Sequence, residues 1–175
     1  GSYNGSIIHR SVDDFVVQGG GFTFDTDFTA IEKKAAIANE PVLSNVKGTI
    51  AMAKQSGNAN SATSQWFFNL KDNSANLDVQ NGGFTVFGEI TQESFEVLTK
   101  ITDLVHCGEI PVVGLNEDQC PETTAGFNGE NLVTINSVVV IDENPDSSAG
   151  LSPVENTLID GDDKGGDSGS SSGSM

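Results

Sequence analysis

The sequence has 175 residues, enough for one domain and a tail, since single domains usually comprise about 100 to 200 residues. Asp and Glu number 25 against 8 Lys and Arg, which gives a formal net charge of -17, and a surface of that sign repels nucleic acid and anionic lipid headgroups. The sequence contains no apolar run of the roughly 18 residues that a membrane-spanning helix needs. Nucleic acid and the bilayer interior are therefore excluded as expected binding environments.

Short β-type runs separated by turn residues extend along most of the chain, the pattern typical of an all-β barrel or sandwich. Two segments depart from it. Residues 31–40 could form a short helical turn, and residues 94–105 place apolar side chains at helical spacing and predict a helix. The fold is therefore predicted to be mainly β with one or two short helices. The predicted strands are residues 6–10, 15–18, 48–54, 65–70, 84–90, 132–135 and 137–141.

The end of the sequence differs in composition from the rest, so the domain is predicted to comprise residues 1–143. Prolines and a glycine within residues 144–160 argue against a helix or a central strand, which predicts an extended linker whose few apolar side chains could dock weakly on the domain. Ten of the fifteen residues from 161 to 175 are Gly or Ser. Such a composition cannot bury enough apolar surface to order the chain, and residues 161–175 are predicted to be a disordered tail.

The two cysteines, Cys107 and Cys120, lie thirteen positions apart in a segment rich in turn-forming and acidic residues. A disulfide between them would stabilise the domain by about 3 kcal/mol in an oxidising compartment. The alternative is a pair of unrelated thiols. A metal site is disfavoured, because His9 and His106 are the only histidines and no Cys-x-x-Cys pair occurs.

Arg10 is the only arginine in a sequence with seven lysines. A guanidinium keeps its charge when desolvated and presents a planar fork of donors, so a single arginine in a β-rich domain indicates a fixed polar contact. The alternative is a surface arginine paired with Asp13 or Asp14.

The residues around Arg10 carry a family resemblance. Four blocks, residues 3–22, 39–54, 61–70 and 82–90, resemble in order and spacing the cyclophilin family of peptidyl-prolyl cis-trans isomerases, particularly its bacterial members. The resemblance implies a cyclophilin-like antiparallel β-barrel. It also implies that the family's N-terminal strands and first helix are absent from this sequence, which begins at a later point in the family pattern.

The resemblance assigns site residues by position. Arg10 matches the catalytic arginine, and Phe15 and Gln18 match the pocket residues that follow it, with Gln18 expected to orient Arg10. The substrate-binding positions that match are Ala53, Lys54, Gln65, Phe67, Leu77 and Phe84. By strand alternation, Phe68 and Phe87 are predicted to lie in the core instead, and His9 to be structural.

The implied reaction needs neither a metal nor a cofactor. Rotation about an X-Pro bond removes the double-bond character of the amide, with a barrier of about 18 to 20 kcal/mol. A guanidinium directed at the prolyl nitrogen would stabilise the twisted state, in which that nitrogen regains a lone pair, and would do little for the planar ground state. Phenylalanines and Leu77 would form the slot for the proline ring, and Gln65 and the backbone near Ala53 and Lys54 would hold the peptide.

The expected partners are proline-containing peptides and unfolded proteins. Asn76 stands where many eukaryotic members carry a tryptophan important for cyclosporin, so binding of that drug is predicted to be weak. The alternative function is a non-catalytic proline-peptide-binding module, as a chaperone or a surface interaction domain. A calcium-binding adhesive domain, suggested by residues 160–166, is disfavoured because Ser171 occupies the place of the expected twelfth-position glutamate.

The tail also carries a resemblance. Gly/Ser-rich spacers of this kind look like the region before a C-terminal sorting helix on exported bacterial proteins. Together with the acidic excess and the cysteines, this predicts a periplasmic or cell-surface location in a bacterium, with any membrane anchor outside this sequence and the cytoplasm as the alternative.

Overall fold

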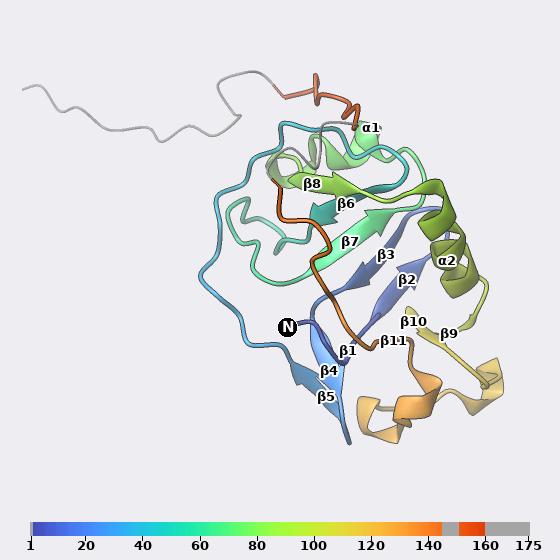
Figure 1. The fold of residues 1–175 in the computed structure, drawn as a ribbon. Helices are drawn as coiled ribbons and strands as arrows, with labels where there is room; N and C mark the ends of the chain where they lie inside the picture. Colours follow the sequence, from blue (N-terminus) through green and yellow to red (C-terminus); the bar gives the residue numbers. More distant parts are fainter. Residues whose placement is uncertain (1, 145–150, 160–175) are drawn as a thin grey trace, which may run out of the picture.

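A computed structural model describes residues 2–144 and 151–159. Within them the chain is mainly β, as predicted, and its strands are short (Figure 1). The strands are β1 (Ser6–Ile7), β2 (Arg10–Val12), β3 (Val16–Gly19), β4 (Phe22–Phe24), β5 (Phe28–Ala30), β6 (Thr49–Met52), β7 (Trp66–Asn69), β8 (Val86–Glu89), β9 (Val105–Cys107), β10 (Ile110–Val112) and β11 (Thr134–Ile135). The α-helices are α1 (Ser74–Leu77) and α2 (Gln92–Thr102), and the 3-10 turns are η1 (Gln80–Gly82), η2 (Glu117–Gln119), η3 (Thr124–Gly126) and η4 (Gly129–Asn131).

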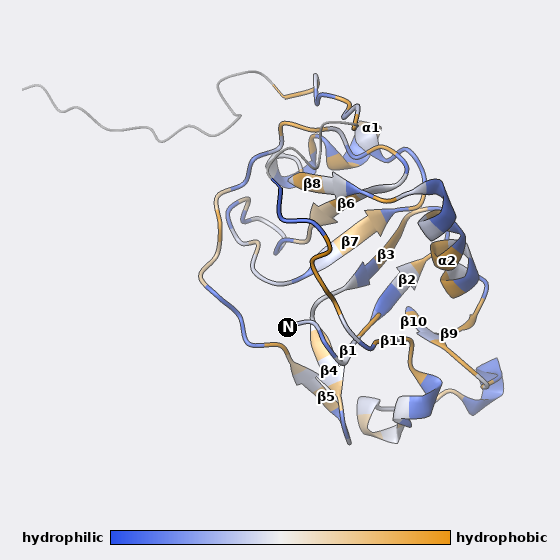
Figure 2. Ribbon diagram, viewed as in Figure 1, coloured by the Kyte–Doolittle hydropathy of each residue, from blue (hydrophilic) through white to orange (hydrophobic). Residues whose placement is uncertain are grey.

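The largest sheet has five strands in the order β2-β3-β7-β6-β8, every neighbour antiparallel. Because successive side chains point to opposite faces of a strand, this sheet separates two apolar clusters. Val16 and Phe67 belong to the cluster on one face, whereas Val17 and Phe68 belong to the cluster on the other. Figure 2 shows the apolar residues of β7 in the middle of this sheet.

Helix α2 covers the second of these faces. The hydroxyl of Thr91 caps its N-terminus by accepting a hydrogen bond from the Ser94 amide at 3.2 Å. Leu98 is the helix residue buried most deeply and packs in the cluster with Ile8 and Val17. The helix predicted from the spacing in residues 94–105 is therefore confirmed up to Thr102, and its amphipathic face packs against the sheet. Val105 belongs to β9 instead.

The remaining strands form a four-stranded sheet in the order β11-β1-β4-β5 and the hairpin β9-β10. An apolar cluster lies between this sheet and the hairpin, and Ile7 and Val112 are its most deeply buried residues. The described residues thus contain three separate antiparallel sheets and no single closed barrel. None of the described helices is long and apolar enough to cross a bilayer.

Three local predictions are wrong. Residues 31–40 form no helical turn, because residues 32–38 are all exposed and offer no apolar face for packing. Residues 137–141 form no strand: Ile141 is 95% exposed, and no neighbouring strand in the described part of the chain pairs with this segment. Phe87 is 54% exposed on β8, an edge strand of the largest sheet, instead of lying in the core.

The described part of the C-terminal segment, residues 151–159, returns to the domain beside α1. The Ser44 amide donates to the Val154 carbonyl at 2.8 Å, and the Asn156 amide donates to the Val42 carbonyl at 2.8 Å. The main buried contact is polar, since Asn156 is fully buried whereas Val154 is 52% and Leu158 is 54% exposed. The predicted tail, residues 161–175, lies outside the described residues.

Candidate active site

Antiparallel pairing aligns three of the site residues, followed by Ala51, across the largest sheet. Arg10 lies opposite Gln18, Gln18 lies opposite Phe67, and Phe67 lies opposite Ala51. Since directly paired residues share a face of the sheet, the guanidinium, the amide and the aromatic ring lie on the same side. This row leads from the polar edge of the site, at Arg10, to its apolar part.

The apolar part is a wall formed mainly by Phe67, Leu77 and Phe84. Phe67 and Leu77 are buried in one cluster, against which the half-buried Phe84 packs. The Phe67 and Phe84 rings meet edge to face with centroids 5.6 Å apart. The Phe84 amide also donates to the Leu77 carbonyl at 3.0 Å, so the loop from α1 to β8 brings these two side chains together.

Phe15 joins this wall to Arg10. A tight turn between β2 and β3 places it: the Phe15 amide donates to the Val12 carbonyl at 3.1 Å, and Asp14 has a φ of 52°. The ring packs against the same apolar cluster, and the Arg10 Cζ atom lies 5.9 Å from its centroid. The guanidinium therefore lies at the rim of the apolar wall.

Gln18 does not orient Arg10 as expected from the sequence. Its Nε2 donates instead to Oε1 of Gln65 at 2.8 Å. The Gln65 carbonyl in turn accepts a hydrogen bond from the Ala53 amide at 2.9 Å. Gln18, Gln65, Ala53 and Lys54 line a depression of about 110 Å³, which provides a polar region beside the apolar wall.

Lys54 closes the other side of the site. Its Nζ donates to the Asn81 carbonyl at 2.9 Å and to the Gly83 carbonyl, and it lies 4.6 Å above the centroid of the Phe84 ring. Burial lowers the pKa of Lys54 from 10.5 to about 8 because a desolvated ammonium is costly. Lys54 thus fixes the loop around Phe84 and adds a second positive charge to the site.

Glu109 is the site residue that sequence reasoning missed. Arg10 Nε donates to Glu109 Oε2 at 2.8 Å, and Arg10 Nη2 donates to Glu109 Oε1 at 3.2 Å. The ion pair of Arg10 is thus with Glu109 and not with Asp13 or Asp14. Glu109 lies 99 positions from Arg10, in the turn between β9 and β10, and no local sequence pattern connects the two.

A buried polar network lies behind the apolar wall. Asp78, which directly follows Leu77, is 1% exposed, and its carboxylate accepts hydrogen bonds from Ser44 Oγ at 2.5 Å and from the Asn45 amide at 2.7 Å. Asn45 Nδ2 also donates to the Phe84 carbonyl at 3.2 Å. The network therefore connects the end of α1, which carries Leu77, and the loop that carries Phe84 to the segment before β6.

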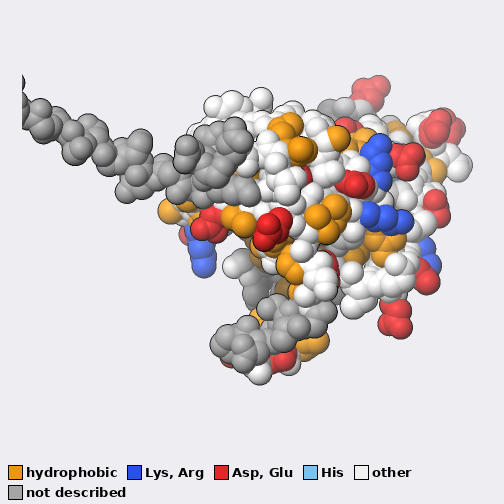
Figure 3. Space-filling view, turned by 90° about the horizontal axis from the view of Figure 1, so that it is seen from above, with side chains coloured by type: hydrophobic (Ala, Val, Ile, Leu, Met, Phe, Trp, Pro, Cys, Tyr) orange, Lys and Arg blue, Asp and Glu red, His pale blue; other side chains and the backbone are white. Residues whose placement is uncertain are grey.

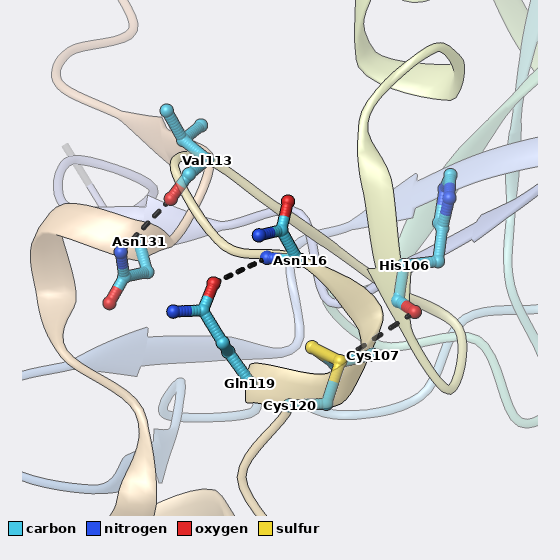
Figure 4. The surroundings of a disulfide bond; sticks show 7 residues. All are labelled: His106, Cys107, Val113, Asn116, Gln119, Cys120 and Asn131. Atoms are coloured by element: carbon cyan, nitrogen blue, oxygen red, sulfur yellow. Dashed lines mark hydrogen bonds between the residues drawn. A yellow bond between two sulfur atoms is a disulfide. The ribbon is translucent and has the colours of Figure 1, made fainter.

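A disulfide joins Cys107 at the end of β9 to Cys120 after η2, with Cα atoms 5.3 Å apart (Figure 4). The closed loop makes one polar contact within itself and one to η4. The Asn116 amide donates to Gln119 Oε1 at 2.8 Å, and Asn131 Nδ2 donates to the Val113 carbonyl at 2.9 Å. The disulfide attaches the hairpin that carries Glu109 to η2.

The histidines give no sign of metal binding. No group of three or more His, Cys, Asp or Glu side chains suited to a metal ion occurs in residues 2–144 and 151–159. The His9 ring packs edge to face on Phe22 with centroids 5.1 Å apart, and burial lowers its pKa. This packing agrees with a structural histidine.

The structure thus brings every residue assigned by the resemblance into one connected region, while their roles in binding and catalysis stay predictions. Figure 3 shows the molecule from above, with acidic and basic side chains scattered among apolar and uncharged ones. The connected residues are Arg10, Phe15, Gln18, Ala53, Lys54, Gln65, Phe67, Leu77 and Phe84.

Comparisons with known proteins point to the same family. The peptidyl-prolyl cis-trans isomerase of Acinetobacter baylyi is 41% identical over 105 residues, covering 58% of this chain and 54% of the relative. Peptidyl-prolyl cis-trans isomerase A of Dickeya dadantii is 42% identical over 106 residues, covering 59% of this chain and 54% of the relative. Isomerase B of Escherichia coli is 36% identical over 107 residues, covering 58% and 63%. The chain therefore spans somewhat more than half the length of these curated relatives.

A crystal structure of a Cryptosporidium parvum cyclophilin in the presence of the dipeptide Ala-Pro superposes with a TM-score of 0.46 at 20% identity, covering 62% of this chain and 68% of that one. The sequence model of the family described as cyclophilin type peptidyl-prolyl cis-trans isomerase/CLD matches residues 1–113, well over half of the sequence, and the chain belongs to that family.

Proposed function

We propose that the protein catalyses cis-trans rotation about X-Pro peptide bonds and so assists protein folding. The observation that carries this proposal is the position of Arg10, whose Cζ atom lies 5.9 Å from the Phe15 ring at the rim of the apolar wall. A donor beside an apolar surface is the combination that this reaction requires: the surface binds the proline ring and the donor stabilises the twisted amide. No covalent bond to the substrate has to form or break.

The proline ring would bind against the wall of Phe67, Leu77 and Phe84. Its burial there supplies apolar binding energy that does not distinguish the planar amide from the twisted one. The distinction comes from Arg10. When the amide twists, the prolyl nitrogen becomes a hydrogen-bond acceptor, and a guanidinium at the rim donates to it only in that state.

The peptide on either side of the proline would lie over the polar depression. Gln18 and Gln65 form a hydrogen-bonded pair there, and Lys54 lies at its edge. Amide side chains offer both donors and acceptors to a peptide backbone, so they would orient the chain without selecting particular side chains. Proline-containing peptides and unfolded segments are the substrate class that this site favours.

Binding of cyclosporin is proposed to be weak. The wall ends at Leu77, and the residue before it, Asn76, is exposed and lacks the aromatic surface of a tryptophan. Calorimetric titration checks this directly, and tight binding of the drug would contradict it.

The rival function is a module that binds proline peptides without turnover. Exchange spectroscopy on a short X-Pro peptide separates the two, comparing the wild type with Arg10→Ala and with Lys71→Ala, a control that removes one exposed positive charge. An isomerase accelerates exchange in the wild type and the control, and Arg10→Ala lowers that acceleration by about 100-fold, the usual effect of losing one donor to the transition state. A binding module broadens the peptide signals but leaves the exchange rate at its uncatalysed value.

We further propose that the protein works in an oxidising compartment, outside the cytoplasm. The disulfide between Cys107 and Cys120 supports this, since structural disulfides persist mainly in exported proteins. Trapping free thiols during extraction from the native source tests it, and two alkylated cysteines would contradict the proposal.

A further inference from the structure

The ion pair between Arg10 and Glu109 has a geometry that fixes the plane of the guanidinium. Two neighbouring donors, Nε and Nη2, reach separate oxygens of one carboxylate at 2.8 and 3.2 Å. Such a two-point contact restricts rotation of the planar group, which a single hydrogen bond does not do. Arginine has five N–H donors, so three remain after this contact is made.

The carboxylate belongs to a rigid part of the structure. The Glu109 carbonyl accepts a hydrogen bond from the Ser11 amide at 2.7 Å, which attaches the turn to β2, the strand of Arg10. Gly108 precedes it with a φ of 67°, a conformation that glycine adopts without strain. Strands β9 and β10 pair on either side of the turn, and the disulfide at Cys107 joins this hairpin to Cys120.

We propose that Glu109 is a positioning residue that holds the Arg10 guanidinium in the orientation needed at the prolyl nitrogen. This inference rests on the proposed isomerase function. The side chain expected to orient Arg10, Gln18, donates its amide to Gln65 instead. Among the described residues, Glu109 is the side chain that accepts hydrogen bonds from the guanidinium.

The exposure of the Glu109 side chain indicates whether this residue raises or lowers the turnover rate. The Glu109 side chain is 57% exposed, so water screens most of its charge and the field of Arg10 at the substrate is reduced only slightly. The restriction of the guanidinium depends on whether the ion pair is formed, not on the strength of the field that Glu109 exerts at the substrate. Glu109 therefore raises the turnover rate, since Arg10 has less rotational freedom to lose when the amide twists.

The test uses the fact that the sequence has a single arginine, so one Nε resonance in a nitrogen-15 spectrum reports on Arg10 alone. Glu109→Gln keeps the size of the side chain but loses the charge and one acceptor oxygen. Glu122→Gln, at an exposed position in the same region, is the matched control. We expect exchange of the Arg10 Hε with water to be about threefold to fivefold faster in Glu109→Gln, in line with an exposed ion pair, and unchanged in the control.

The catalytic measurement is the peptide-exchange assay on the same proteins. Glu109→Gln should lower kcat by about threefold to fivefold with KM nearly unchanged, because Glu109 acts on the orientation of Arg10 and not on substrate binding. Glu109→Asp, which keeps the charge, should recover part of kcat. Raising the salt concentration should lower the kcat of the wild type toward that of Glu109→Gln.

The outcomes are distinguishable. If the wild type catalyses exchange and Glu109→Gln is equally fast or faster, the positioning role is wrong and the isomerase function stands. If the wild type shows no catalysis, both the proposed function and the positioning role are wrong. Slow exchange of the Arg10 Hε would still indicate that the ion pair forms. Equal Hε exchange in all variants overturns the proposal even if kcat falls.

Discussion

Asp78 and Asn45 are joined at two points within the core: Oδ1 of Asp78 accepts hydrogen bonds from the Asn45 backbone amide at 2.7 Å and from Asn45 Nδ2 at 2.9 Å. Neither side chain is more than 1% exposed. Through the contact of Asn45 with the Phe84 carbonyl, this pair supports the apolar wall from behind. A buried carboxylate without an ion-pair partner in the described residues is tolerated because its oxygens are satisfied by donors.

Replacing Asp78 with Ala should therefore destabilise the fold strongly. The change leaves the donors of Ser44 and Asn45 buried without an acceptor, each at a cost of about 1 to 3 kcal/mol. We expect a loss of about 2 to 4 kcal/mol in the free energy of unfolding, measured by urea denaturation. Asp25→Asn, at an exposed position, is the control and should change stability little. Equal midpoints for the two variants would mean that the network does not stabilise the wall.

The predictability of this site depended on how far apart its residues lie in the sequence. The pairing of Arg10 with Gln18 follows from two adjacent strands joined by a short turn, so a local pattern reveals it. Glu109 approaches Arg10 from the β9-β10 hairpin 99 positions away. Nothing in the composition around Glu109 differs from the many other exposed acids of this chain, so only the tertiary fold selects it.

The secondary-structure errors have a similar cause. The apolar run at residues 137–141 has the β-branched composition of a strand, but strand formation also needs a neighbour, and the described residues contain none that pairs with it. Helix α2, in contrast, was predicted correctly, because its amphipathic spacing already encodes the face that packs on the sheet. The spacing in α2 thus contained the information about its packing partner, whereas the composition of residues 137–141 contained none.

The disulfide should contribute to stability through the loop that it closes. Cys107 and Cys120 are separated by thirteen positions, and a loop of that size restricts the unfolded chain by about 3 kcal/mol in the chain-entropy description. The double variant Cys107→Ser/Cys120→Ser should unfold at lower urea concentration by roughly that free energy. The single variant Cys107→Ser should give nearly the same loss, because either change opens the same loop. Unchanged stability of the double variant would show that the cross-link adds nothing to the fold.

Asn156→Ala tests whether residues 151–159 are part of the folded domain. Asn156 is fully buried, and its Nδ2 donates to the Asp78 carbonyl at 2.9 Å. Loss of this contact should reduce the free energy of unfolding by about 1 to 3 kcal/mol, whereas Glu155→Ala, at the exposed position before it, should have little effect. Hydrogen exchange of the Ser44 amide, which donates to Val154, should become faster in Asn156→Ala. Identical exchange in the two variants would mean that the segment contributes little to the domain.

Lys54 should make stability depend on pH in the alkaline range. Burial lowers its pKa from 10.5 to about 8 in the folded protein, so between these values the unfolded chain binds more protons than the folded one. The free energy of unfolding therefore increases as the pH rises from about 8 to 10.5. Below about pH 8, the folded protein bears the full cost of burying the charged Lys54. Between pH 7 and pH 9.5, the free energy of unfolding of the wild type should therefore rise relative to that of Lys54→Gln. The free energy of unfolding of the wild type relative to Lys71→Gln, a control at an exposed position, should stay constant over the same range. In a carbon-13 titration of the lysine Cε signals, a Lys54 midpoint near that of the other lysines would contradict the desolvation that the structure assigns to it.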